Sequence, residues 1–157
     1  MTASFLILRI GDTRFALPLS AAREVLPVLP IDAAPGLPAP VLGFVALQGE
    51  PVAVLAPLLL LEPAAQVEQV ALFAHLVRLR DGGPCLLVDR AEDVVSGDVA
   101  SVEAGHSLNA AIVGELAIGD AVAHVLAPDR LLLDSERATL AALTKAAARR
   151  ADQWNAA

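Results

Sequence analysis

Hydrophobic residues occur along this chain in short runs that are separated by glycine, proline or charged residues. Such runs, punctuated by turn residues, are typical of short β-strands. A glycine can take the positive φ that a tight hairpin turn requires, so Gly11, Gly49 and Gly119 are expected in turns. The strands predicted in this way are Phe5–Ile10, Arg14–Pro18, the two apolar arms around Gln48-Gly49-Glu50 within Gly43–Leu61, Leu72–Leu79, Pro84–Val88, Ala111–Ile118 and Ala121–Leu126.

Helices are predicted at four places. Ser20 can cap a short helix over Ala21–Leu26, because its hydroxyl can accept a hydrogen bond from an unpaired backbone N–H. Proline is tolerated at a first helical position, so a second short helix is expected at Pro57, and a third is expected near Arg90–Val94. The residues from Ser135 onward are rich in Ala and straight-chain side chains, the best helix formers, which predicts a longer terminal helix.

The terminal helix has one apolar stripe, because its hydrophobic residues recur at spacings of three and four. Two interpretations are open. In the first, the helix docks on the protein's own strands. In the second, part of the stripe, including Trp154, is kept for a partner. The stripe consists of Leu140, Leu143, Ala147, Ala151 and Trp154.

The chain contains one unit written twice. Residues 5–26 align without a gap over residues 74–95, and residues 43–61 align over residues 114–133, with an identical Val-Leu-Ala-Pro in the second pair. An Ala- and Leu-rich chain gives chance matches, but two segments in the same order are strong evidence of a repeat. The polar residues 62–69 are the expected seam between the halves.

The composition excludes several classes of protein. Hydrophobic residues make up 56% of the 157 residues and charged residues only 18%, so most of the chain is expected to fold, as one domain or two small lobes. The net charge of −7 argues against nucleic-acid binding, which needs a clustered basic surface. No apolar run reaches the ~20 residues of a membrane span, and no signal peptide is recognised. A cytoplasmic protein is therefore expected.

Residues that could carry catalysis or hold a metal are scattered. The glycine-containing turns lack the Lys-Ser/Thr pair of a phosphate-binding loop. His75, His106 and His124 are isolated, so no zinc site is expected. The single cysteine, Cys85, lies in an apolar run and is expected to be a small buried core residue. Neither an enzyme nor a metal or cofactor site is expected.

The order of these features resembles that of the CheW family of bacterial chemotaxis adaptors. The resemblance rests on a strand, a Gly-Asp turn and a second strand, then on AAREVL at 21–26, a proline-rich loop and GFVALQGEPVAVL at 43–55, and it covers about residues 4–135. It implies a mainly β fold of two five-stranded SH3-like barrels related by a pseudo-twofold, with short helices and a C-terminal α-helix. Short strands closed into barrels also remove exposed sheet edges.

The resemblance implies a protein without catalytic activity or cofactor. It also gives an expected domain organisation. A CheW-like domain is expected over residues 1–134, followed by a helix at 135–157, with the barrels either at about 14–69 and at 4–13 plus 70–134, or as sequential halves at 4–66 and 70–134.

Partners are implied as well. CheW-family members bind the cytoplasmic tips of chemoreceptors and, through the second barrel, the regulatory domain of the histidine kinase CheA, in arrays where the receptor controls the kinase. The resemblance therefore implies recruitment to chemoreceptor arrays, without nucleic acid and without insertion into the membrane. Carried over by position, the receptor-facing residues are Ala22, Glu24, Gly43, Val45, Leu47, Gln48 and Gly49.

The chain departs from the family pattern at the central hairpin turn. The family's Asn-Leu-Arg-Gly is Ala46-Leu47-Gln48-Gly49 here, so both polar signature residues are lost. In the family that arginine is thought to pair with the glutamate that corresponds to Glu24. A neutral Gln48 can exchange a hydrogen bond with Glu24, but it cannot form an ion pair.

Two further departures concern kinase binding. The aspartate that ends the family's next strand is Ala56 here, and the second-half loop at Ser96–Ala111 is shorter than the family's. Three readings follow. The protein links receptors to a CheA-type kinase; or it is an accessory adaptor of the frizzy type, which binds a receptor or another CheW-like protein without CheA. In a different class, it is a small-molecule-binding β-barrel.

Overall fold

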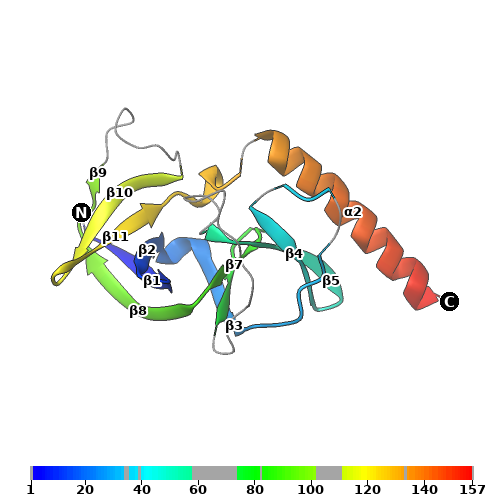
Figure 1. The fold of residues 1–157 in the computed structure, drawn as a ribbon, viewed down its shortest axis with the longest axis horizontal. Helices are drawn as coiled ribbons and strands as arrows, with labels where there is room; N and C mark the ends of the chain where they lie inside the picture. Colours follow the sequence, from blue (N-terminus) through cyan, green and yellow to red (C-terminus); the bar gives the residue numbers. More distant parts are fainter. Residues whose placement is uncertain are drawn as a thin grey trace.

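Two β-sheets form the body of the protein, and a long helix leads away from them to the C-terminus (Figure 1). The computed structural model describes residues 2–33, 36–38, 40–57, 74–81, 83–101, 111–132 and 134–156. The strands of this part of the chain are β1 (Ala3–Ile10), β2 (Thr13–Pro18), β3 (Ala22–Pro27), β4 (Val41–Leu47), β5 (Glu50–Leu55), β6 (His75–Leu79), β7 (Cys85–Val88), β8 (Arg90–Gly97), β9 (Ala100–Ser101), β10 (Ile112–Ile118) and β11 (Ala121–Leu126). Its helices are the 3-10 turns η1 (Leu19–Ala21) and η2 (Pro128–Arg130) and the α-helix α2 (Asp134–Ala156).

The two sheets repeat one strand order. Sheet A has the order β8-β1-β2-β11-β10-β9, and sheet B has the order β3-β6-β7-β5-β4. Replacing each strand of sheet B by its counterpart in the sequence repeat turns β3-β6-β7-β5-β4 into β8-β1-β2-β11-β10, which is sheet A without β9. The expected mainly β architecture with a C-terminal helix is confirmed, and the duplication is visible as a pseudo-twofold in the topology.

Neither half of the chain completes a sheet by itself. The third strand of each half pairs with a strand of the other half, β3 with β6 and β8 with β1. The parallel pairs β2–β11 and β5–β7 also join different halves. Residues 4–66 and 70–134 each contribute strands to both sheets, and so does the range 14–69.

Two of the predicted short helices are strands in the structure. The helix predicted at Ala21–Leu26 is β3, preceded by η1, which has no side-chain cap, and the helix predicted near Arg90–Val94 is part of β8. These predictions were wrong because the backbone groups of both segments bond to the edges of β6 and β1, and such pairing overrides a weak helix propensity. The helix expected at Pro57 and the seam at 62–69 fall, except for Pro57 itself, outside the described residues.

Each barrel closes beside a glycine that both halves of the repeat contain, Gly43 on β4 and Gly114 on β10. There, the segment that precedes the strand pairs with it. In sheet B, Asp32 exchanges two backbone hydrogen bonds of 2.8 and 2.9 Å with Phe44 on β4. In sheet A, β9 pairs with β10 in the equivalent place. A Cβ added to Gly43 would overlap the Asp32 carbonyl, and one added to Gly114 would overlap the Val99 side chain. The repeat therefore keeps a glycine here because two segments cross at backbone distance.

Strand β1 is buried on both faces. Phe5 and Ile7 point into a core enclosed by sheet A, whereas Leu6, Leu8 and Ile10 point into a core between the two sheets. This explains why the segment reads as a continuous apolar run. Sheet B encloses a third core, formed by Val45, Val54, Ala74, Leu76, Cys85 and Leu87.

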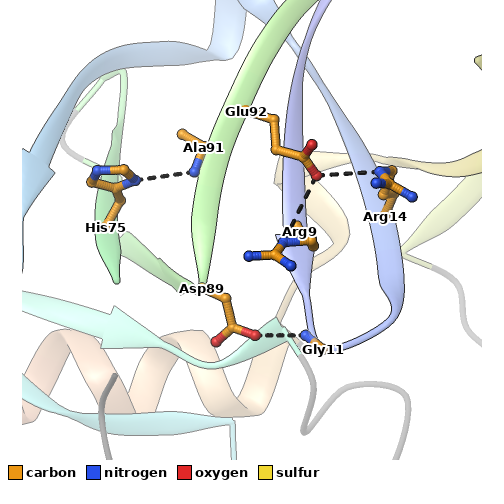
Figure 2. A network of polar contacts seen from close by, with 7 residues as sticks. All are labelled: Arg9, Gly11, Arg14, His75, Asp89, Ala91 and Glu92. Atoms are coloured by element: carbon orange, nitrogen blue, oxygen red, sulfur yellow. Dashed lines mark hydrogen bonds and ion pairs between the residues drawn. The ribbon is translucent and has the colours of Figure 1, made fainter. Parts of the chain in front are cut away.

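Charged side chains of β8 and of the residue before it form polar contacts with the β1–β2 hairpin (Figure 2). The Arg14 Nε lies 3.2 Å from Oε1 of Glu92, and the Arg9 Nε lies 4.0 Å from the same oxygen. At the turn, the backbone N–H of Gly11 donates to Oδ2 of Asp89 at 2.6 Å. All of these groups are at least partly exposed, so they add little to stability.

His75 marks a difference between the halves. Its counterpart in the repeat, Leu6, packs in the core between the sheets. Through Nδ1, His75 accepts a hydrogen bond of 3.1 Å from the backbone N–H of Ala91 (Figure 2). The counterpart N–H, of Ala22, is satisfied by the Leu19 carbonyl in η1. In the second half the equivalent residues, Val88 to Arg90, form no 3-10 turn, and the histidine supplies the acceptor.

The interleaved strands predict that the halves fold only together. Residues 2–62 and 69–157, expressed separately, should each lack a cooperative thermal transition, because each lacks strands of both sheets. Mixing them should restore β-sheet circular dichroism and a 1:1 complex in gel filtration. An isolated half with a cooperative melt of its own would contradict this expectation.

The barrel crossings predict a cost for a single methyl group. Gly43→Ala and Gly114→Ala should each lower the free energy of unfolding by about 2 kcal/mol or more, because the overlapping atoms include backbone or packed side chains that must shift. Denaturant titration measures this. Gly36→Ala is the control, since its Cβ would meet open space and only the positive φ of 81° opposes it. Losses no larger than that of the control would refute the crossing argument.

Candidate partner-binding surface

The predicted receptor-facing residues come from two parts of sheet B. Ala22 and Glu24 lie on β3, and the others lie on β4 and in the turn between β4 and β5. β3 and β4 are the two terminal strands in the hydrogen-bonding order of this sheet. The structure thus places all seven residues on one barrel, although the first two belong to a strand and not, as expected, to a helix.

Glu24 has a partner that the sequence did not reveal. Its Oε1 lies 3.5 Å from Nη1 of Arg78, which is directly opposite on β6. The Glu24 side chain is 43% exposed and that of Arg78 is 14% exposed. Glu24 thus forms a cross-strand ion pair with Arg78 and not the hydrogen bond that Gln48 could have supplied. The negative charge of Glu24 is therefore presented at the surface by a mostly covered arginine from the other half of the chain.

The β4 residues divide into supporting and exposed positions. Gly43 and Val45 are buried, and Val45 packs in the core enclosed by sheet B. Leu47 is half-buried and packs against the same core. Gln48 and Gly49 are exposed at the tip of the hairpin. A partner that meets this hairpin end-on would contact Leu47, Gln48 and Gly49, while Gly43 and Val45 fix the shape beneath.

The hairpin tip has an unusual backbone. Gln48 has φ 53° and Gly49 has φ 81°, and in the second half Gly119 takes φ 56° at the position equivalent to Gln48. Positive φ at both central residues is the two-residue hairpin geometry that matches the twist of the flanking strands. A non-glycine residue in this region is unfavourable by about 1 kcal/mol. Gln48 therefore occupies a position where glycine or asparagine would be easier to accommodate.

An open groove of about 780 Å³ adjoins this surface. One wall is the start of α2, and the other is formed by β5 and the β6–β7 turn. Arg78, the partner of Glu24, and Glu50, the residue after the hairpin turn, both line it. The remaining charged lining residues are Arg80, Asp81, Asp129 and Arg137. Charges of both signs on apolar walls suit an amphipathic protein segment better than a small ion.

The groove was not foreseen because its walls are distant in sequence. Leu140 of α2 is buried in the core between the sheets, and Leu143 packs against that core. The first interpretation of the terminal helix, docking on the protein's own strands, holds for this part of the stripe. The side chains of Ala151 and Trp154 lie outside the described residues.

Within the described ranges, no group of three or more His, Cys, Asp or Glu side chains is placed to hold a metal ion. His124 packs its ring against Phe15, with ring centroids 6.1 Å apart. Cys85 is fully buried, as expected from its apolar neighbours. In the described part of the chain, no helix is long and apolar enough to cross a membrane.

Comparison with known proteins agrees with this geometry. The family model described as a CheW-like domain matches residues 4–136. The chain belongs to the CheW-like domain family. Among solved structures, the scaffolding protein TtCheW from Thermoanaerobacter tengcongensis is similar, with a TM-score of 0.74 and 15% sequence identity over 87% of this chain and 91% of that chain. The comparison with curated proteins gives no match.

The family match and the structural likeness confirm the expected fold of two SH3-like barrels. α2 is largely outside the matched range, which ends two residues after α2 begins. The seven carried-over site residues all lie inside the match. Their role in binding stays a prediction.

The burial of Cys85 predicts an unreactive thiol. Burial raises the pKa of Cys85 above its usual value of 9.0, against a smaller lowering by Arg78 and with a further small rise from Glu24. The folded protein should therefore keep the thiol protonated at pH values where an exposed thiol ionises, and stability should fall as the pH rises past the unfolded thiol's pKa.

Ellman's reagent measures this difference. At pH 8, labelling of the folded protein should be at least ~100-fold slower than labelling in denaturant, because the thiolate is the reactive species and the sulfur is covered. The Cys85→Ala variant gives the background. Equal rates in the folded and unfolded states would show that the sheet B core opens readily.

Proposed function

We propose that this protein is a non-catalytic cytoplasmic adaptor of a bacterial chemosensory array. In this proposal it binds the cytoplasmic tip of a chemoreceptor through the end of sheet B and connects it to a CheA-type kinase pathway. Membership of the CheW-like domain family supports the adaptor role. The observation that carries the binding site is the exposed Glu24, held by Arg78 beside the groove.

The energetics of this ion pair favour recognition over folding. An ion pair with one well-exposed partner contributes only ~0–1 kcal/mol to stability. Charge at a partner surface has a larger effect on specificity and on the association rate. Glu24 can therefore contribute to partner binding without loss of the fold, because the fold depends on apolar cores that lie elsewhere.

Kinase binding is the less supported half of the proposal. The hairpin arginine of the family is Gln48 here, and most of the second-half loop lies outside the described residues. An accessory adaptor that binds a receptor or another CheW-like protein, without CheA, is the closest variant of the proposal. Titration with the kinase regulatory domain distinguishes the two: micromolar binding supports the linking adaptor, and no binding supports the accessory one.

The size of the groove leaves a second candidate function open, the binding of a small molecule. A volume of about 780 Å³ falls within the range of small-molecule sites, ~300–1,000 Å³. However, its opposed charges leave few polar groups that converge on one point. A metabolite that gave saturable thermal stabilisation would favour a ligand-binding barrel, and receptor binding would then need a separate explanation.

The receptor-binding proposal has a matched control built into the repeat. Glu24→Lys should weaken binding of a purified receptor tip at least ~10-fold, because it reverses the exposed charge. It also places a lysine opposite Arg78, so that two positive charges repel each other. Asp93→Lys, the equivalent change on β8, should leave that affinity unchanged. Isothermal titration calorimetry measures both, and circular dichroism checks that both variants are folded.

A Gln48→Arg variant tests the hairpin tip separately. It returns the family's charge to the turn, and we expect tighter binding of the same receptor tip.

An equal loss of affinity in the Glu24 and Asp93 variants would argue against a sheet B site. Absence of binding to receptor tips by the unmodified protein would sink the proposal itself.

A further inference from the structure

The end of α2 differs in charge from the rest of the molecule. The whole protein has a net charge of −7, whereas residues 145–152 contain Lys145, Arg149 and Arg150 and a single anion, Asp152. All four side chains are exposed. Lys145 and Arg149 are four residues apart and therefore lie on the same side of the helix. With the other described residues, the three cations form no ion pair.

This basic segment is held away from the body by a well-anchored helix. At the start of α2, Arg137 donates through Nη2 to the carbonyls of Asp129 and Leu132, at 2.5 and 3.5 Å. One turn later, Leu140 is buried in the core between the sheets. Beyond that point α2 runs past β5 and ends clear of the rest of the ribbon (Figure 1). We call residues 145–152 the basic arm.

The other end of the molecule is acidic. Sheet A lies at the opposite end of the longest axis from the C-terminus (Figure 1). Its strands and turns carry three arginines, and two of these, Arg9 and Arg14, share the carboxylate of Glu92. The remaining carboxylates outnumber them. Six exposed acids of these strands and turns have no ion pair among the described residues: Asp12, Asp89, Asp93, Asp98, Glu115 and Asp120. Asp12 and Asp89 lie at the β1–β2 turn, whereas Asp98, Glu115 and Asp120 belong to β10 and to the β8–β9 and β10–β11 turns, at the outer end of sheet A (Figure 1).

We propose that the basic arm of one molecule docks on the acidic outer end of sheet A of a second copy, the surface around Asp98, Glu115 and Asp120. The two surfaces are complementary in sign and lie at opposite ends of one molecule. A contact between two different surfaces is heterologous, so each added copy leaves one arm and one sheet A free. Self-association would therefore extend in one direction and give open chains. This inference goes beyond receptor binding and does not depend on it.

The purified protein alone is sufficient for the test. Sedimentation velocity should show a weight-average mass that rises with protein concentration at ~20 mM salt and returns to the monomer at ~500 mM salt, because exposed charges are screened over a shorter distance. A protein that stays monomeric at low salt at every concentration would overturn the proposal.

Matched charge variants separate the basic arm from net charge. Arg149→Glu/Arg150→Glu should abolish the low-salt association, whereas Arg23→Glu/Arg130→Glu, which changes the net charge equally at exposed positions away from the arm, should retain it. Association that survives reversal of the arm would overturn the proposal. Thermal melts at high salt confirm that the variants fold.

A second pair of changes tests the acidic surface. Glu115→Arg/Asp120→Arg should also abolish association, and mixing this variant with the arm variant should restore it as open chains in which the two variants alternate. Restoration is expected because the two reversed surfaces are again opposite in sign. Failure of the mixture to associate would show that sheet A is not the docking surface. Since no receptor is present, none of these results bears on receptor binding.

Discussion

The exchange of the third strand between the two halves is the constraint on which the structure depends. β3 completes the edge of β6, and β8 completes the edge of β1, so that each sheet satisfies its backbone hydrogen bonds with strands from both halves. The exchange also creates the candidate site. Glu24 arrives with β3 from the first half and Arg78 with β6 from the second, and they meet only because the strand has crossed.

The hairpins, the repeat and the terminal helix were predictable because their signals are local. A glycine turn between two apolar runs is readable from adjacent residues, as at Gly49, and α2 is readable from its composition. β3 and β8 carry no such signal. Every residue of β3 is exposed or half-buried. Its side chains do not alternate between apolar and polar, and the run Ala22-Arg23-Glu24 favours helix when taken alone. Only the partner strand, far along the chain, makes it extended.

The candidate site was foreseen in part for the same reason. Position-by-position comparison located Glu24 and the hairpin tip, but it could not supply Arg78, which is 54 residues away. It also could not separate Val45, which supports the surface from within the core, from Gln48, which is exposed on it. Burial is a property of the assembled sheet. A period-two pattern gives it only when one face of a strand is solvated, and on β4 three consecutive residues, Gly43, Phe44 and Val45, are buried.

The places where the two halves differ are informative because the shared backbone would otherwise make them equal. His75 stands where the first half has the core residue Leu6, and it accepts a hydrogen bond from the backbone N–H of Ala91. In the first half the equivalent N–H, of Ala22, is satisfied by η1 instead. Gln48 replaces Gly119 and has no such role: it accepts a less favourable backbone and has an exposed side chain. Residues in unfavourable backbone regions cluster at functional sites, and Gln48 is one of the residues proposed above to contact a partner. Among the described residues the cores contain no buried polar or charged side chain, so the chemistry available for recognition lies on the surface, where it can change without disturbing the strands beneath.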